Sequence, residues 1–133
     1  MSEMLSRWPV LISVALVETD RDDNRVLTDT AVERAFALAR SAYFDRCRTV
    51  AQSDTSVVAI NAVVDAPVDT NSIDVSVGVV EIYPDRFTME LRARPSAGEG
   101  VAARGRCTLA LAEITDQTRD EFIRLAHGAR YIN

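Results

Sequence analysis

Hydrophobic positions along this chain follow two periods, and together they predict five strands and two helices. Residues 10–17 form a β-branched run that is apolar on both faces, which is typical of a strand in the middle of a covered sheet. Residues 56–64 form a second such run, which ends before Ala66-Pro67. Strict alternation of apolar and polar residues then predicts half-buried strands. These later strands are expected at residues 73–82, 87–94 and 101–113.

A helical period separates the first two strands. Residues 31–45 contain no Gly or Pro, and their apolar positions recur at helical spacing and cover almost the whole circumference, so we expect this helix to be wrapped by other elements. Thr28, Asp29 and Thr30 are all suitable N-caps, and Thr30 with Glu33 has the spacing of a capping box.

The chain closes with a pattern that predicts a short helix over residues 117–127. Gly128 is placed as its C-cap, and His127 then lies in the last turn, where the helix dipole favours it. No repeat or linker interrupts the order strand, helix, four strands, helix. One long apolar helix followed by antiparallel strands predicts a single α+β domain over residues 1–133, with a curved antiparallel sheet wrapped around the helix.

Composition narrows the function classes. The net charge of −5, without a basic stripe, argues against nucleic-acid binding. The apolar runs are shorter than the roughly 20 residues of a membrane span, and the first residues lack the features of a signal peptide. Cys47 and Cys107 have no metal-binding or redox-motif spacing and are expected to be reduced thiols, so we expect a cytoplasmic protein without membrane association.

The candidate chemistry lies in the acidic loop between the first strand and the long helix. A carboxylate beside a helix N-terminus is suited to attack on a carbonyl, because the free backbone N–H groups there can hold a developing oxyanion. Asp22 and Asp23 are the candidates in this loop. Taken alone, an Asp-rich loop is more often a solvated turn or a cap.

The loop resembles that of the hotdog-fold thioesterases of the 4-hydroxybenzoyl-CoA thioesterase-like group. Their first strand leads into Asp-x-Asp-x-x-Gly-x-Val and a helix that often ends in Tyr-Phe. Here the corresponding residues are Asp20-Arg-Asp22-Asp-Asn-Arg25-Val26-Leu27 and Tyr43-Phe44. The loop is also similar to Asp-x-Asn-x-His-Val-Asn-Asn of the acyl-carrier-protein thioesterases, which it matches at Asp22 and Asn24. The resemblance implies a hotdog fold.

The resemblance also implies a reaction and a site. Asp22 would be the catalytic carboxylate, acting on a thioester of coenzyme A or of an acyl carrier protein, and Asn24 would orient the carbonyl or the water. Backbone N–H groups near Thr28, Asp29 and Thr30 would hold the oxyanion. The implied assembly is a homodimer or a dimer of dimers with the pocket between protomers. No cofactor and no metal is implied.

The loop departs from the family pattern at two positions. Arg25 replaces the common Gly and Val26 the common His. We expect the Arg25 guanidinium to pair with a carboxylate of its own loop or to meet an anionic part of the ligand. The departures favour, as the alternative, a non-catalytic hotdog protein that binds an acyl-CoA or an acylated carrier, or that pairs with an active partner. A hotdog dehydratase or hydratase is less favoured, because that chemistry usually uses a loop His.

Further polar positions have two interpretations each. Asn61, in an apolar strand, is either a satisfied core amide, which we favour, or a substrate-facing group from the partner subunit. Glu33 and Arg40 lie seven residues apart on one helix face and are interpreted as a structural polar stripe, although some hotdog enzymes carry their carboxylate on this helix. Arg104 and Arg106 could meet a phosphate of coenzyme A, but arginines on a wet strand face are common.

Overall fold

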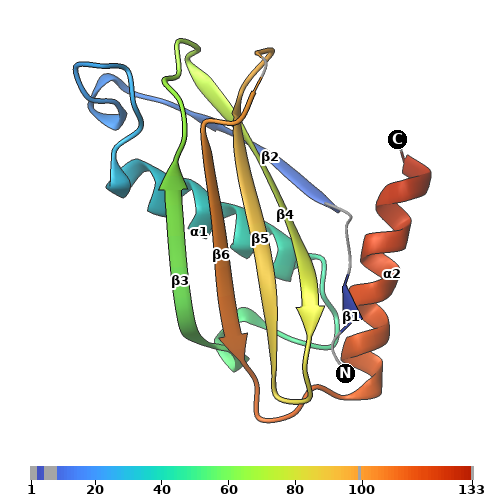
Figure 1. Ribbon diagram of the computed structural model, residues 1–133. Coiled ribbons are helices and arrows are strands. Elements are labelled where there is room, and N and C mark those ends of the chain that lie inside the picture. The colour runs from blue at the N-terminus through green and yellow to red at the C-terminus, as the bar shows by residue number, and fades with distance from the viewer. Residues whose placement is uncertain (1–2, 5–8, 99, 133) are drawn as a thin grey trace.

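The computed structural model describes residues 3–4, 9–98 and 100–132 and consists of one curved antiparallel sheet, a helix behind it and a second helix at its side (Figure 1). The strands are β1 (Glu3–Met4), β2 (Val10–Ala15), β3 (Ser56–Val64), β4 (Ser72–Ile82), β5 (Arg86–Pro95) and β6 (Ala103–Ala110). The helices are α1 (Asp29–Asp45) and α2 (Asp116–Ile132). The predicted order of elements is therefore confirmed, and only β1 had no sequence signal.

The sheet has the order β4–β5–β6–β3, with β1 and β2 both pairing with the other side of β4. β2 pairs with the first half of β4, from Val10 opposite Val77 to Ala15 opposite Ser72, and β1 pairs with its last residues. The prediction of β2 as a central strand is thus wrong. The side chains on its outer face lie in solvent, and Leu11 is 63% exposed. The prediction failed because apolar residues on both faces of a strand do not by themselves distinguish a central strand from an edge strand.

The inner face of the sheet packs on α1 and forms the core. Alternate residues of β4 and β5 point inward, as their period of two predicted, and they meet the apolar side of the helix. Gly105 of β6 allows the closest approach, since a Cβ at that position would lie 2.6 Å from a ring carbon of Phe36. The buried residues of α1 are Ala31, Val32, Ala35, Phe36, Ala39, Tyr43 and Phe44.

The helix α1 begins two residues earlier than expected and is less enclosed. Thr28 is its N-cap, with Oγ1 accepting from the Ala31 N–H at 3.1 Å, and Thr30 lies inside the helix, so the predicted Thr30–Glu33 capping box does not form. The sheet covers one side of the helix only. On the other side Leu38 is 49% exposed. The prediction that other elements of the chain enclose this helix on almost all sides is therefore wrong.

The helix α2 is longer than predicted and closes one end of the core. It continues through Gly128 to Ile132, so Gly128 is not its C-cap and His127 does not lie in its last turn. Gly inside a helix is disfavoured by only about 1 kcal/mol relative to Ala, so a lone Gly is a weak stop signal. Phe122 of α2 packs against Phe87 and Tyr43, with ring centroids 4.8 and 6.1 Å apart.

A buried carboxylate ties α2 to the segment after α1. Glu121 accepts hydrogen bonds from the backbone N–H groups of Arg48 and Thr49 and from Thr49 Oγ1, at 2.7 to 3.0 Å. Burial raises the pKa of Glu121, but these hydrogen bonds outweigh burial and hold the pKa below its usual range. The Glu121 carboxylate therefore stays charged while it accepts hydrogen bonds from the free backbone N–H groups of the loop after α1.

The edge strand β3 differs from every other long strand of the described structure, because both of its faces are exposed except at Val64, which packs partly against the core. Eight of its nine residues are exposed and the ninth is half-buried. It contains no charged residue and no Pro, and among the described strands it pairs only with β6. Four large side chains are each more than half exposed: Val57, Val58, Ile60 and Val63. Natural proteins usually protect such an edge with charges or Pro.

Candidate functional site

The acidic loop after β2 folds into a tight three-residue hairpin loop. The Asp22 N–H donates to the Val26 carbonyl at 2.8 Å, and the Arg25 N–H donates to the Asp22 carbonyl at 3.0 Å. Arg25 takes the third loop position with φ = 66°, in the left-handed region. Glycine is preferred at that position of such a loop, because it has no Cβ to clash. This conformation explains physically why the resembling loops carry Gly where this chain has Arg25.

The side chain of Asp22 is part of the same turn. Its Oδ1 accepts from the backbone N–H groups of Asn24 at 2.8 Å and Val26 at 3.1 Å. These two bonds fix the orientation of an otherwise exposed carboxylate. Asn24 lies in the same turn and is also exposed, so both predicted catalytic residues are accessible to solvent.

The other aspartate of the motif has a structural role that the sequence did not indicate. Asp20 is buried and accepts two parallel hydrogen bonds from Arg34 of α1, at 3.0 and 2.9 Å, and one from the Val17 N–H at 2.8 Å. The bidentate Arg34 contact, followed by the Val17 hydrogen bond, lowers the pKa of Asp20. Asp20 thereby anchors the start of the loop to the helix.

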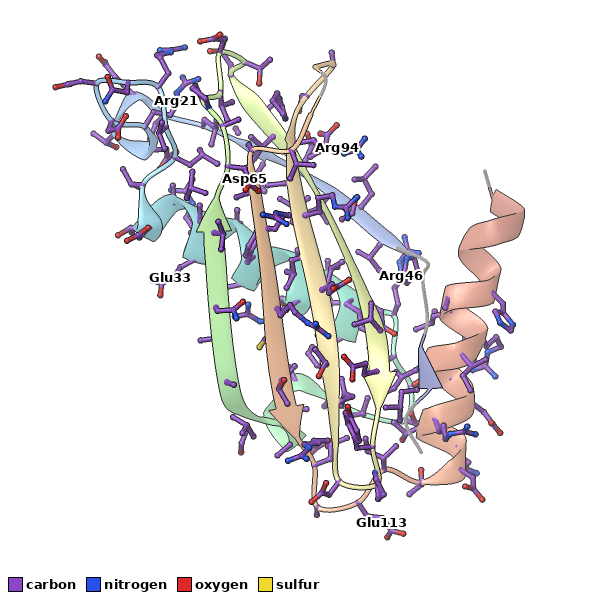
Figure 2. The ribbon with its side chains drawn as sticks, viewed as in Figure 1. Arg21, Glu33, Arg46, Asp65, Arg94 and Glu113 are labelled. Carbon is purple, nitrogen blue, oxygen red and sulfur yellow. The ribbon has the colours of Figure 1, made fainter. Side chains whose placement is uncertain are left out.

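The loop is also held to the connection between β3 and β4, at the upper end of the sheet in Figure 2. Arg21 donates to the carbonyls of Val68 and Thr70 at 3.0 and 2.6 Å, and the Val68 N–H donates to the Arg25 carbonyl at 2.8 Å. Arg25 pairs with Asp69 of this connection, Nε to Oδ1 at 3.5 Å. The predicted pairing of Arg25 with a carboxylate of its own loop is therefore wrong. The Arg25 backbone is hydrogen-bonded to the connection between β3 and β4, and this connection brings the Asp69 carboxylate close to the guanidinium.

The start of α1 lies directly after this turn. The Thr28 N–H donates to the Asp20 carbonyl at 3.0 Å and is already used, so Thr28 cannot supply an oxyanion donor from its backbone. Asp29 and Thr30 occupy the first two helical positions and are exposed. The N–H groups of these positions have no acceptor within an α-helix. Asp29 and Thr30, rather than Thr28, are the positions from which backbone donors can face a ligand.

Asn61 lies on a different surface. It is exposed on the outer face of β3, so its interpretation as a core amide was wrong. Together with Arg104 and Arg106 it lines a shallow hollow of about 260 Å³. Both arginines are paired with carboxylates: Arg104 binds Asp65 at 2.8 and 3.0 Å, and Arg106 binds Glu81 and lies 3.8 Å from Glu90. This pairing favours the interpretation of a wet strand face.

Two features are absent from the described part of the chain. No group of three or more His, Cys, Asp and Glu side chains is arranged to hold a metal ion. No helix there is both long enough and apolar enough to cross a membrane. Cys47 and Cys107 are free, as expected.

Comparison with solved structures agrees with this architecture, whereas no protein-family model and no curated protein matches the sequence. A thioesterase from Thermus thermophilus, solved with coenzyme A and zinc, superposes with a TM-score of 0.79 at 19% identity, over 92% of this chain and 98% of that one. A putative thioesterase from Pseudomonas putida gives 0.71 at 15% identity, over 88% and 84%. The DHNA-CoA thioesterase from Staphylococcus aureus gives 0.66 at 14% identity, over 92% and 91%. This chain therefore has the hotdog fold that these thioesterase structures share.

Proposed function

We propose that the protein hydrolyses thioesters of coenzyme A or of an acyl carrier protein, with Asp22 as the catalytic carboxylate. The observation that carries the proposal is the Asp22 carboxylate, held by two backbone N–H groups in the turn that leads into α1. Its Oδ2 is then the oxygen available to a substrate or a water. The fold, shared with structures named thioesterases, supports the same reaction.

The chemistry needs few groups. Asp22 takes a proton from water, the water oxygen attacks the thioester carbon, and the C–S bond breaks to release the acid and a thiolate. Because a thiolate leaves readily, no general acid is required. The N–H groups of Asp29 and Thr30 stabilise the oxyanion, and Asn24 orients the carbonyl or the water. A base and an oxyanion site are thus sufficient.

The test is release of free thiol from a panel of acyl-CoAs. Asp22→Asn keeps an oxygen that can accept from the Asn24 and Val26 N–H groups, so the turn and the melting temperature should persist. Turnover should fall by roughly a hundredfold to ten-thousandfold, the range for loss of a general base. Asp23→Asn, an exposed neighbour, is the matched control and should retain turnover. If Asp23→Asn loses activity and Asp22→Asn does not, the assignment of Asp22 is wrong.

A binding-only function is the second candidate, and one observation favours it. Asp29 places a carboxylate in the first turn of α1, and the Thr28 N–H is already bonded to Asp20. An anion at this helix start meets a like charge, which opposes an oxyanion. A wild-type protein that hydrolyses no thioester but gains thermal stability from an acyl-CoA would establish this alternative.

The proposal includes assembly and location. We infer a homodimer, alone or as a dimer of dimers, because the exposed apolar strand β3 is otherwise a template for association. The cytoplasm is the inferred location, supported by the free thiols of Cys47 and Cys107.

A further inference from the structure

A hollow between the end of α1 and the helix α2 collects three arginines from two separate parts of the chain. It has a volume of about 400 Å³ and is lined by Arg46, Arg48, Glu121, Arg124 and Leu125. This volume lies within the range of small-molecule sites, about 300–1,000 Å³. Arg46 and Arg48 follow α1 directly, whereas Arg124 comes from α2. No basic run in the sequence indicates this cluster, because only the fold brings its members together.

The hollow is separate from the candidate thioesterase site. Asp22 lies in the turn before the start of α1, and the hollow lies beyond the end of that helix. The helix is 17 residues long, so its two ends are about 24 Å apart. In Figure 2 Arg46 lies on the side of the sheet next to α2, whereas Arg21 of the acidic loop lies on the opposite side.

The lining residues carry an excess of positive charge. Glu121 is the one carboxylate among them, and it is only 2% exposed. Its oxygens already accept hydrogen bonds from the N–H groups of Arg48 and Thr49 and from the Thr49 hydroxyl. Three guanidinium groups and one carboxylate leave two positive charges in a chain whose net charge is −5. The hollow therefore favours a doubly charged anion.

Most of the guanidinium donors are available to such an anion. Among the described residues, no hydrogen bond or ion pair involves the exposed Arg48 side chain. Arg124 Nη2 lies 3.8 Å from Glu121 Oε2, which is farther than a hydrogen bond. Arg46 donates from Nη1 to the Pro9 carbonyl at 3.2 Å. A guanidinium carries several N–H groups, so each arginine keeps donors that can point into the hollow.

The dipole of α1 offers a simpler explanation for only part of this cluster. Cations after the end of a helix are stabilising by about 0.3–1 kcal/mol, which accounts for Arg46 and Arg48. The dipole of α1 does not account for Arg124, which belongs to the middle of a different helix. The convergence of both elements on one hollow is what a bound anion explains.

We propose that this hollow binds a phosphate dianion, either free or as the end group of a phosphomonoester. A phosphate monoester carries close to two negative charges above neutral pH, which matches the excess charge of the lining. The planar forks of Arg48 and Arg124 suit its oxygens, and Arg46 adds a third cation. The half-buried Leu125 offers an apolar contact to the organic part of a monoester.

The test is isothermal titration calorimetry with inorganic phosphate and with phenyl phosphate, without any thioester. The wild type should bind at least one of the two probes. Arg48→Gln and Arg124→Gln should each raise Kd roughly tenfold or more, since a hydrogen bond to a charged group is lost. Arg94→Gln removes an exposed arginine of β5 outside the hollow and should leave Kd unchanged. Tighter binding of phenyl phosphate would identify a monoester as the ligand, and equal binding would identify free phosphate.

Thermal unfolding separates binding from loss of folding. Neither substitution removes a backbone N–H that binds Glu121, so the variants should melt close to the wild type without phosphate. Phosphate also stabilises proteins generally by exclusion from their surface, and that effect should be equal in all variants. The additional rise in melting temperature should disappear in Arg48→Gln and Arg124→Gln. Absence of binding in the wild type, or a Kd and a melting shift unchanged in both variants, would overturn the site.

Discussion

Replacement of Arg25 separates the backbone conformation of the loop from the charge that it carries. Arg25→Ala and Arg25→Gly both remove the ion pair with Asp69, which is exposed on both sides and contributes about 0–1 kcal/mol. The two variants therefore share the loss of charge. They differ in how well the new residue accepts φ = 66° and in how flexible it makes the unfolded chain.

The magnitude follows from two opposing effects. The left-handed region costs a residue with a Cβ about 1–2 kcal/mol, and glycine escapes this cost. Glycine also makes the unfolded chain more flexible, which lowers stability by about 0.4–1 kcal/mol. The difference leaves Arg25→Gly more stable than Arg25→Ala by roughly 0.8 kcal/mol, or about 3 °C in melting temperature for a chain of this size.

The assay is urea unfolding followed by circular dichroism at one fixed protein concentration, since an assembling protein changes stability with concentration. Ala97→Gly is the matched control outside the site, because Ala97 has φ = 58° in an exposed turn and should gain stability relative to wild type for the same reason. If Arg25→Ala unfolds at the same or a higher urea concentration than Arg25→Gly, the left-handed backbone at position 25 does not lower the stability of the protein, and the reasoning is refuted.

Three further predictions concern single groups of the described structure. Asp20→Asn should destabilise the protein by roughly 1–3 kcal/mol, less than a fully buried pair because Arg34 is 45% exposed. Because the pKa of Asp20 is lowered in the folded state, its contribution to the free energy of unfolding is complete above the ordinary Asp range and disappears as pH falls through the lowered pKa. The urea midpoint should therefore decrease less steeply toward acid pH in Asp20→Asn than in the wild type. Burial raises the pKa of Cys47 to about 12, so a thiol reagent at pH 8 should label it far more slowly in native than in unfolded protein; equal rates would contradict the burial. Gly105→Ala should cost about 1–3 kcal/mol in urea unfolding, because its Cβ would lie 2.6 Å from Phe36, and an unchanged midpoint would show that the ring moves freely.

Local sequence patterns were sufficient to predict the long strands and helices, but they did not indicate which strands lie at the edges of the sheet. The period of two in β4 and β5 and the uninterrupted helical period of α1 gave their order and inward faces. β2 and β3 are both apolar throughout, and only the pairing of strands far apart in the sequence makes them edges. The helix α2 extends beyond Gly128 because one glycine does not stop a helix.

The candidate site was predictable in its position but not in its division of roles. The spacing of the loop indicated Asp22, which does lie in the turn before α1. Asp20 looks the same in the sequence, and only the fold brings it to Arg34, fourteen residues further along. Likewise, the partner of Arg25 is Asp69, more than forty residues away, which no local pattern could indicate.

The attachment of the loop through Arg21 determines which of the positions in this contact can be substituted during evolution. Arg21 binds the main-chain oxygens of Val68 and Thr70, not their side chains. Every amino acid offers the same oxygen, so positions 68 and 70 can change without breaking the attachment, whereas Arg21 cannot be exchanged for a shorter or uncharged residue. Correlated substitution between these positions is therefore not expected, and a search for paired changes would overlook one of the firmest contacts of this loop.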